Sequence, residues 1–163
     1  MAGRPLPIPQ VLTVLEEGPP RIAALTADLA PARLRMATED GGWSANGVLA
    51  HLRACADVWG HCMAAMLAED TPTLRAANPT TRIEETDYLD LEFGPSLQAF
   101  AAQRAELLAL LEPLPQAGWS RAATVTGAGK PLRRTVLFYA QWLARHERTH
   151  DKQVDRIVRE MRR

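Results

Sequence analysis

Hydrophobic positions follow a helical period most regularly in the last part of the chain, from residue 134 to residue 163. This stretch contains no Pro or Gly, so the pattern predicts one uninterrupted helix. Its apolar stripe includes two histidines, His146 and His150. Residues four apart lie about 40° apart around a helix with Cβ atoms about 6 Å apart, so both imidazoles can reach one point. The rest of the stripe consists of Tyr139, Leu143, Val154, Ile157 and Met161.

The first part of the chain predicts a bent helix. Apolar residues recur at helical spacing over residues 10–17 and again over residues 21–29. Between them, Gly18-Pro19-Pro20 is expected to break or kink the helix, because proline removes a backbone donor and clashes with the preceding turn. A single turn of helix is predicted around Arg33, followed by a loop over residues 38–42.

A second long helix is predicted to begin after Ser44, which can act as its N-cap, and to run to about Leu67. His51 lies within the apolar stripe of this helix. His61 is rotated about 80° from His51 and is expected to reach solvent. The stripe consists of Val48, Leu52, Cys55, Val58, Trp59, Cys62 and Met66.

A third long helix is predicted from Ser96, as its N-cap, to about Glu112. The segments on either side, residues 70–95 and 120–131, are irregular, and the second is expected to form a loop or a small hairpin. Four amphipathic segments with irregular connections predict an all-α four-helix bundle, one domain over residues 1–163. The side chains expected to face inward from the third helix are Leu97, Phe100, Ala101, Leu107, Leu108 and Leu111.

Composition and charge argue against several classes of protein. Nineteen basic and nineteen acidic residues give no net charge, which does not favour a nucleic-acid-binding surface. No apolar run approaches the roughly 20 residues of a membrane span, and the Pro-interrupted N-terminus lacks the apolar region of a signal peptide. We therefore expect a cytoplasmic protein without a nucleic-acid or membrane partner. Cys55 and Cys62, about 10 Å apart along one helix, are expected to be free thiols.

The inward histidines are the candidate chemistry of the chain. Imidazoles in an apolar stripe need polar partners, and the facing helices of a bundle commonly supply metal ligands to its interior. Two alternatives remain at this stage. The histidines can be core residues bonded to backbone or water, or the helix face can be misjudged and leave them in solvent. The H-x-x-x-H spacing is a short motif that does not decide between these interpretations.

Two fragments, WSANGVLAHL from Trp43 to Leu52 and WLARHERTHDKQVDRI from Trp142 to Ile157, resemble the DinB/YfiT-like superfamily. This family, which is unrelated to the translesion polymerase that shares the DinB name, has W-S before a helix with one His-Leu and H-x-x-x-H on its last helix. Gly47 departs from the family pattern, in which the position three residues after the Ser is commonly a helix-forming residue such as Glu. The resemblance implies an up-down-down-up bundle, often homodimeric, with a divalent ion. Its three metal ligands fall on His51, His146 and His150.

Three neutral imidazoles suit Zn, Ni or another first-row divalent ion and leave a coordination position open. The resemblance therefore suggests an enzyme acting on a small molecule, with a thiol S-transferase that uses a low-molecular-weight thiol favoured. A metal-dependent hydrolase and a non-enzymatic metal- or ligand-binding stress protein are the alternatives. If a fourth side chain such as Cys55 closed the coordination sphere, the binding protein would be favoured. We expect Cys55, however, to be a small buried thiol.

The remaining candidates are expected to have supporting roles. Glu147 and Asp151 each follow a predicted ligand and point about 100° away from it, so we expect solvated or outer-shell groups and not general bases. The sequence assigns no catalytic residue, and it contains no P-loop or dinucleotide-binding motif.

The second and third helices have apolar residues over a wider arc of their surface than packing within one bundle requires, which predicts a homodimer. This spread comprises Trp59, Met63, Met66 and Leu110.

Overall fold

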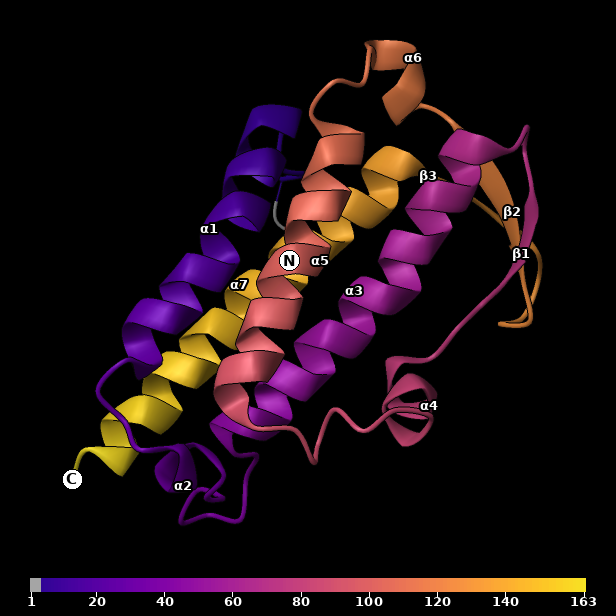
Figure 1. Cartoon of the computed structure of the whole chain (residues 1–163). Coiled ribbons are helices and arrows are strands. Elements are labelled where there is room, and N and C mark those ends of the chain that lie inside the picture. Colours follow the sequence, from indigo (N-terminus) through magenta and orange to yellow (C-terminus); the bar gives the residue numbers. More distant parts are fainter. Residues whose placement is uncertain (1–3) are drawn as a thin grey trace.

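Four long helices form the body of the molecule. The computed structural model describes residues 4–163, and its long helices pack side by side (Figure 1). The first and the last run in one direction, and the second and the third run in the other. This arrangement confirms the predicted up-down-down-up four-helix bundle. The four helices are α1 (Ile8–Thr26), α3 (Ala45–Ala68), α5 (Phe93–Leu111) and α7 (Val136–Met161).

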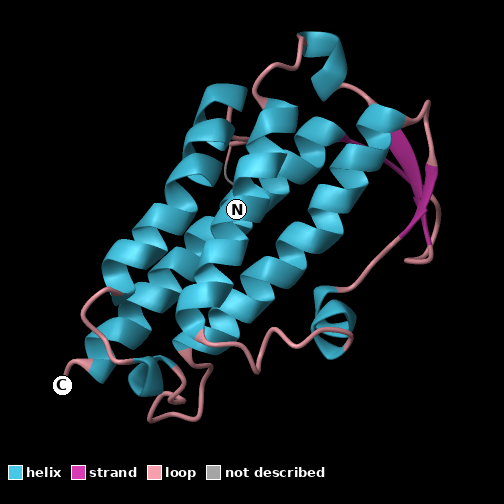
Figure 2. Ribbon diagram, viewed as in Figure 1, coloured by secondary structure: helices cyan, strands magenta, loops and turns pink. Residues whose placement is uncertain are grey.

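Short helices and a small sheet make the connections (Figure 2). The middle strand of the sheet, β2, pairs in parallel with β1 and antiparallel with β3. The β2–β3 pair is the small hairpin considered for residues 120–131. The strand β1 was not predicted, because three residues are too few to show an alternating pattern. The short elements are α2 (Pro31–Leu34), β1 (Thr73–Arg75), α4 (Pro79–Glu84), α6 (Gln116–Trp119), β2 (Ala122–Thr126) and β3 (Leu132–Thr135).

The predicted N-caps have different outcomes. The Ser44 hydroxyl accepts a hydrogen bond from the Gly47 backbone N–H at 3.0 Å, which confirms Ser44 as the cap of α3. The prediction for Ser96 was wrong, because α5 already begins at Phe93. Pro95 falls in the first turn of α5, where backbone N–H groups have no partner within the helix, so it does not delay the helix start. The Ser96 hydroxyl instead accepts a hydrogen bond from Arg53 Nη1 at 3.0 Å.

Of the break or kink predicted for the first helix, the break is absent, since α1 continues through Gly18-Pro19-Pro20. Proline at position 19 cannot donate to the Leu15 carbonyl, which would leave a polar atom unpaired inside the bundle. Arg104 of α5 replaces this donor, because its Nη1 lies 2.9 Å from the Leu15 carbonyl oxygen. A contact from another helix thus offsets part of the cost of the proline.

Arg104 also forms a buried ion pair with Glu147 of α7. The side chains of Arg104 and Glu147 are 2% and 1% exposed, and the two guanidinium Nη groups bind the two carboxylate oxygens in a fork. Gly18 makes room for the pair, since a Cβ at this position would lie 3.3 Å from Glu147 Oε2. Ala101, predicted to face inward, is exposed, because the buried stripe of α5 passes through Phe100 and Arg104 and leaves position 101 about 100° to one side.

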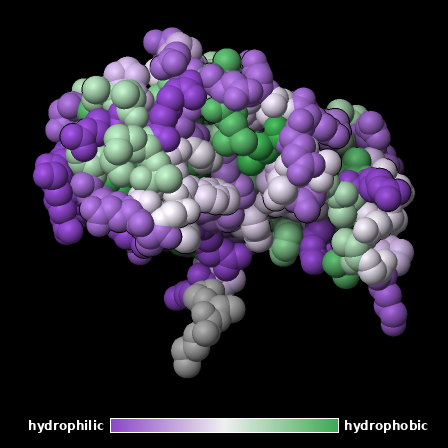
Figure 3. All heavy atoms as spheres, turned by 90° about the horizontal axis from the view of Figure 1, so that it is seen from below, coloured by the Kyte–Doolittle hydropathy of each residue, from purple (hydrophilic) through white to green (hydrophobic). Residues whose placement is uncertain are grey.

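Glu147 and Asp151, expected to be solvated or outer-shell groups, are both buried, which excludes the solvated alternative. The apolar spread proposed for a dimer is also largely covered within the chain. Met63 and Met66 are fully buried in a core cluster that includes Trp119. Figure 3 shows hydrophobic residues interspersed with hydrophilic ones on the face seen from below. The exposed large hydrophobic residues are Met36, Trp43, Leu89, Leu110 and Leu132.

Within residues 4–163, no helix is long and apolar enough to cross a membrane.

The Arg104–Glu147 pair makes a stability prediction. Glu147→Ala should lower the free energy of unfolding by about 3–5 kcal/mol, because it leaves the Arg104 guanidinium buried without its counter-charge. The double variant Arg104→Met with Glu147→Met should recover much of this loss, since it removes both charges. Unfolding in urea, followed by circular dichroism, measures both effects.

The matched control for this test is Asp155→Ala, which removes a pair with Arg159 on the surface of the same helix. Exposed pairs of this kind contribute under about 1 kcal/mol. A Glu147→Ala variant that is no less stable than Asp155→Ala would contradict the assigned role of the buried pair.

Candidate metal centre

Three histidines converge between α3 and α7. His51 lies in the second turn of α3, and His146 and His150 lie one turn apart on α7. His146 Nε2 is 2.9 Å from His51 Nε2 and 3.1 Å from His150 Nε2. The ring centroids of His51 and His150 are 4.7 Å apart. The structure therefore brings together the three histidines that the sequence analysis singled out, and it places His61 in an exposed position as expected.

Gln153 orients one of these imidazoles. Its Oε1 lies 2.7 Å from His150 Nδ1, and a carbonyl oxygen can only accept a hydrogen bond, so Nδ1 carries the proton. In the neutral ring, Nε2 then has its lone pair free and directed at His146. This resembles metal sites, in which a ligating histidine donates its other ring N–H to a neighbouring oxygen. Gln153 was not identified from the sequence, although residues three apart on a helix, such as His150 and Gln153, are neighbours on its surface.

Burial keeps two of the rings neutral. Removal from water lowers the pKa of His51 to about 4, and the nearby His150 adds to this effect. Burial likewise lowers the pKa of His146 to about 4, with smaller effects from His150 and His51. At neutral pH both rings have an unprotonated nitrogen, and the convergent Nε2 atoms repel one another unless a proton or a cation lies among them. The donor set therefore fits a divalent metal ion.

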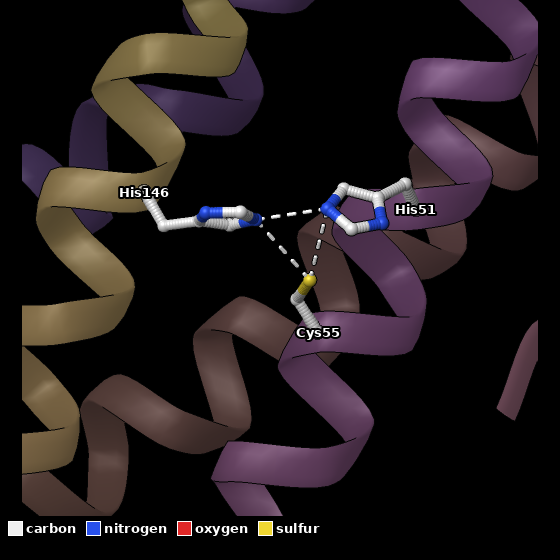
Figure 4. A group of neighbouring side chains, drawn as sticks. All are labelled: His51, Cys55 and His146. Atoms are coloured by element: carbon white, nitrogen blue, oxygen red, sulfur yellow. Dashed lines mark hydrogen bonds between the residues drawn. The ribbon is translucent and has the colours of Figure 1, made fainter. Parts of the chain in front are cut away.

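A thiol lies beside the imidazoles. Cys55 Sγ is 3.4 Å from His51 Nε2 and 3.4 Å from His146 Nε2, and Figure 4 shows the three side chains pointing toward one another from α3 and α7. Their potential ligand atoms all lie within 4.8 Å of one another. Cys55 is fully buried, as expected, and burial raises the pKa of its thiol to about 12. In the absence of a cation Cys55 is therefore protonated.

Tryptophans surround the histidines. Trp142 stacks on His146 with ring centroids 4.6 Å apart, and Trp59 packs against Trp142 with centroids 3.9 Å apart. Trp43 contacts His51 edge-on, with centroids 5.2 Å apart, and is itself 50% exposed. The centre is therefore enclosed by aromatic rings on one side and opens to solvent beside Trp43. A cavity of about 740 Å³ between α3 and α5 is separate, because none of these histidines lines it.

The residue after His146 has a structural role. The segment from His146 to His150 reads H-E-R-T-H, so it matches H-E-x-x-H, in which the Glu is the general base of zinc metalloproteases. Interpreting this spacing as H-x-x-x-H, without the Glu, was therefore wrong. In the structure both carboxylate oxygens of Glu147 are bound by Arg104. Glu147 is therefore held away from the histidine face and is not placed to accept a proton there.

Comparisons with known proteins identify the family and the fold. The model of the DinB superfamily matches residues 15–154. A similar solved structure is that of YfiT from Bacillus subtilis, described as a probable metal-dependent hydrolase with an unusual four-helix bundle topology. The two chains share 21% identity with a TM-score of 0.79, over 94% of this chain and 87% of YfiT. At this identity the similarity establishes the fold alone. No curated protein matches the chain.

Single alanine variants test the assignment of ligands. His51→Ala, His146→Ala and His150→Ala should each reduce Zn affinity by more than the roughly 10–100-fold typical of losing an outer-shell partner. His61→Ala should leave affinity unchanged, because this side chain is exposed. Competition titration with a chromophoric chelator measures the affinities. Loss of binding in His61→Ala with retention in His51→Ala would contradict the assignment.

The protonation of the metal-free centre can be measured directly. Burial penalises the charged imidazolium, so the ring protons of His51 and His146 should show no titration between pH 5.5 and 7.5 and should shift only near pH 4. NMR of metal-free protein, with His51→Ala and His146→Ala to assign the signals, follows this. Midpoints near 6.5, the ordinary value for histidine, would show that the rings are solvated.

Proposed function

The chain belongs to the DinB superfamily, and on this basis we propose that it is a divalent-metal-dependent enzyme whose ion is held by His51, His146 and His150. The observation that supports the proposal is the convergence of the imidazole Nε2 atoms at 2.9 and 3.1 Å. Zn, Ni and other first-row divalent ions suit such a nitrogen donor set. When bound, an ion of this kind lowers the pKa of a coordinated water or thiol, or polarises a carbonyl.

The reaction that we favour is transfer of a low-molecular-weight thiol to an electrophilic small molecule. Trp142 stacks on His146 and Trp59 packs against Trp142 at a tilt, so the two rings cover one side of the histidines. The half-exposed ring of Trp43 offers an apolar surface where solvent reaches the centre. A thiol bound to the ion would have a lowered pKa and would release its proton to water. The resulting thiolate would form a bond to the electrophile by addition or by displacing its leaving group, so no general base is required from the protein.

A metal-dependent hydrolase is the second candidate, because YfiT is described as a probable hydrolase of this kind. Hydrolysis by H-E-x-x-H enzymes uses the Glu as a general base. In this chain Glu147 is bound by Arg104 at both oxygens, so it is not available as that base. A hydrolase of the H-E-x-x-H type is therefore disfavoured, and hydrolysis here would depend on the lowered pKa of an ion-bound water alone. A non-enzymatic metal-binding protein is the third candidate and is supported by the position of Cys55.

Metal removal and reconstitution test the proposed function. Tag-free protein treated with a chelator should be inactive, and stoichiometric Zn or Ni should restore activity, because the ion supplies the reactive group. Thiol transfer is followed as adduct formation by mass spectrometry, and ester and amide hydrolysis are assayed in parallel. His61→Ala is the matched control and should retain activity that His150→Ala loses. Metal-loaded protein without either activity would contradict the enzyme proposal and favour the binding protein.

We also propose a homodimer, as expected from the resemblance, with exposed Leu110 as its apolar contact. Sedimentation at micromolar concentration should give twice the chain mass of 17.9 kDa. Leu110→Glu should shift this mass toward the monomer, because it places a charge in an apolar contact. A mass of one chain that does not change with concentration would exclude the dimer.

A further inference from the structure

We propose that Cys55 is a fourth protein ligand of the ion, so that the resting centre has three nitrogen donors and one sulfur donor. The inference rests on the proposed metal site and specifies its donor set. Its main evidence is the position of Sγ, which lies 3.4 Å from imidazole nitrogens of two different helices, His51 of α3 and His146 of α7. The two ring nitrogens are themselves 2.9 Å apart, so the thiol and both imidazoles direct potential ligand atoms at one point.

The distances among these atoms suit a tetrahedral ion. With Zn–N of about 2.0–2.1 Å and Zn–S of about 2.3 Å, tetrahedral geometry separates two nitrogens by about 3.3 Å and a nitrogen from the sulfur by about 3.5 Å. His146 Nε2 lies 2.9 Å from His51 Nε2 and 3.1 Å from His150 Nε2, and Cys55 Sγ lies 3.4 Å from both His51 Nε2 and His146 Nε2, which is close to these values. The group whose potential ligand atoms all lie within 4.8 Å of one another comprises His51, Cys55 and His146. His150 lies outside this group, so its ring has to shift further than the others to complete the sphere.

The helix explains why Cys55 reaches the centre. Cys55 is four residues after His51, so both side chains project from one face of α3 toward α7. Cys55 is also 0% exposed. A water molecule could therefore occupy the coordination position of Sγ only by displacing the thiol. When Cys55 binds the ion, its S–H bond breaks, Sγ donates an electron pair to the ion, and the proton passes to water.

A sulfur ligand changes what the centre prefers and what it can do. Thiolate donors select Zn and related soft or borderline ions over Mg and Mn. Four protein ligands also leave no open position in a tetrahedral sphere. An external thiol or water would then bind only if the ion became five-coordinate or if Cys55 left it. In the proposed enzyme, Cys55 would therefore be a ligand of the resting ion that substrate joins or displaces on binding.

Cobalt substitution tests the proposal in the full chain. Tag-free protein loaded with Co(II) should show a thiolate-to-cobalt charge-transfer band in the near ultraviolet. Cys55→Ser should lose this band and should bind Zn at least about 10-fold more weakly, since a neutral hydroxyl is a poorer ligand than a thiolate. Cys62→Ser is the matched control, because Cys62 is a second buried thiol of the same helix that lies outside the histidine cluster. It should retain the band.

X-ray absorption of the Zn-loaded wild type needs no variant and is therefore independent of folding defects in Cys55→Ser. It should show one sulfur at about 2.3 Å and nitrogens at about 2.0–2.1 Å. Bound metal with nitrogen or oxygen neighbours only, or a charge-transfer band retained in Cys55→Ser, would overturn ligation by Cys55 and leave the three-histidine site standing. Wild-type protein that binds no metal would overturn both proposals.

Discussion

The buried ion pair between Arg104 and Glu147 determines how three of the four long helices meet. Arg104 extends from α5, binds the carboxylate of α7 and donates to the Leu15 carbonyl of α1. Two sequence features of α1 match this contact, since Pro19 frees the Leu15 carbonyl and Gly18 leaves space beside Glu147. A charged pair in this position is costly to bury and specific in geometry, so it favours one rotation of α7 over others.

The rotation of α7 in turn places the histidines. Glu147 adjoins His146 in sequence, so fixing the carboxylate toward α1 and α5 directs the imidazole about 100° around the helix, where α3 carries His51 and Cys55. On this side of α7, Trp142 stacks on His146, and burial keeps His51 and His146 neutral. One face of α7 thus carries the carboxylate of a buried ion pair. The other face carries imidazoles whose unprotonated nitrogens can bind a cation.

Much of the fold could be predicted from the sequence, because helical periodicity reports which face of each helix is buried. The positions of His51, His146 and His150 in apolar stripes predicted that all three side chains face inward. The family resemblance predicted that they meet at one site. The break at Pro19 was predicted wrongly because the donor that replaces its N–H comes from Arg104, 89 residues away along the chain. Arg104 and Glu147 were missed for a related reason. A single charged residue within an apolar stripe suggests that the helix face was assigned wrongly. A buried ion pair becomes apparent only when an opposite charge lies on the stripe of a facing helix. Contact between Cys55 and two imidazoles depends on packing between helices, which periodicity does not describe.

The central claim is that the histidine cluster holds one divalent ion in each chain, and elemental analysis of protein purified without a histidine tag tests it most directly. We predict one equivalent of a first-row divalent metal per chain in the wild type, and almost none when His51, His146 and His150 are all replaced by Ala. A wild-type protein that remains folded, contains almost no metal and takes up none from added Zn, Ni or Co would contradict the account.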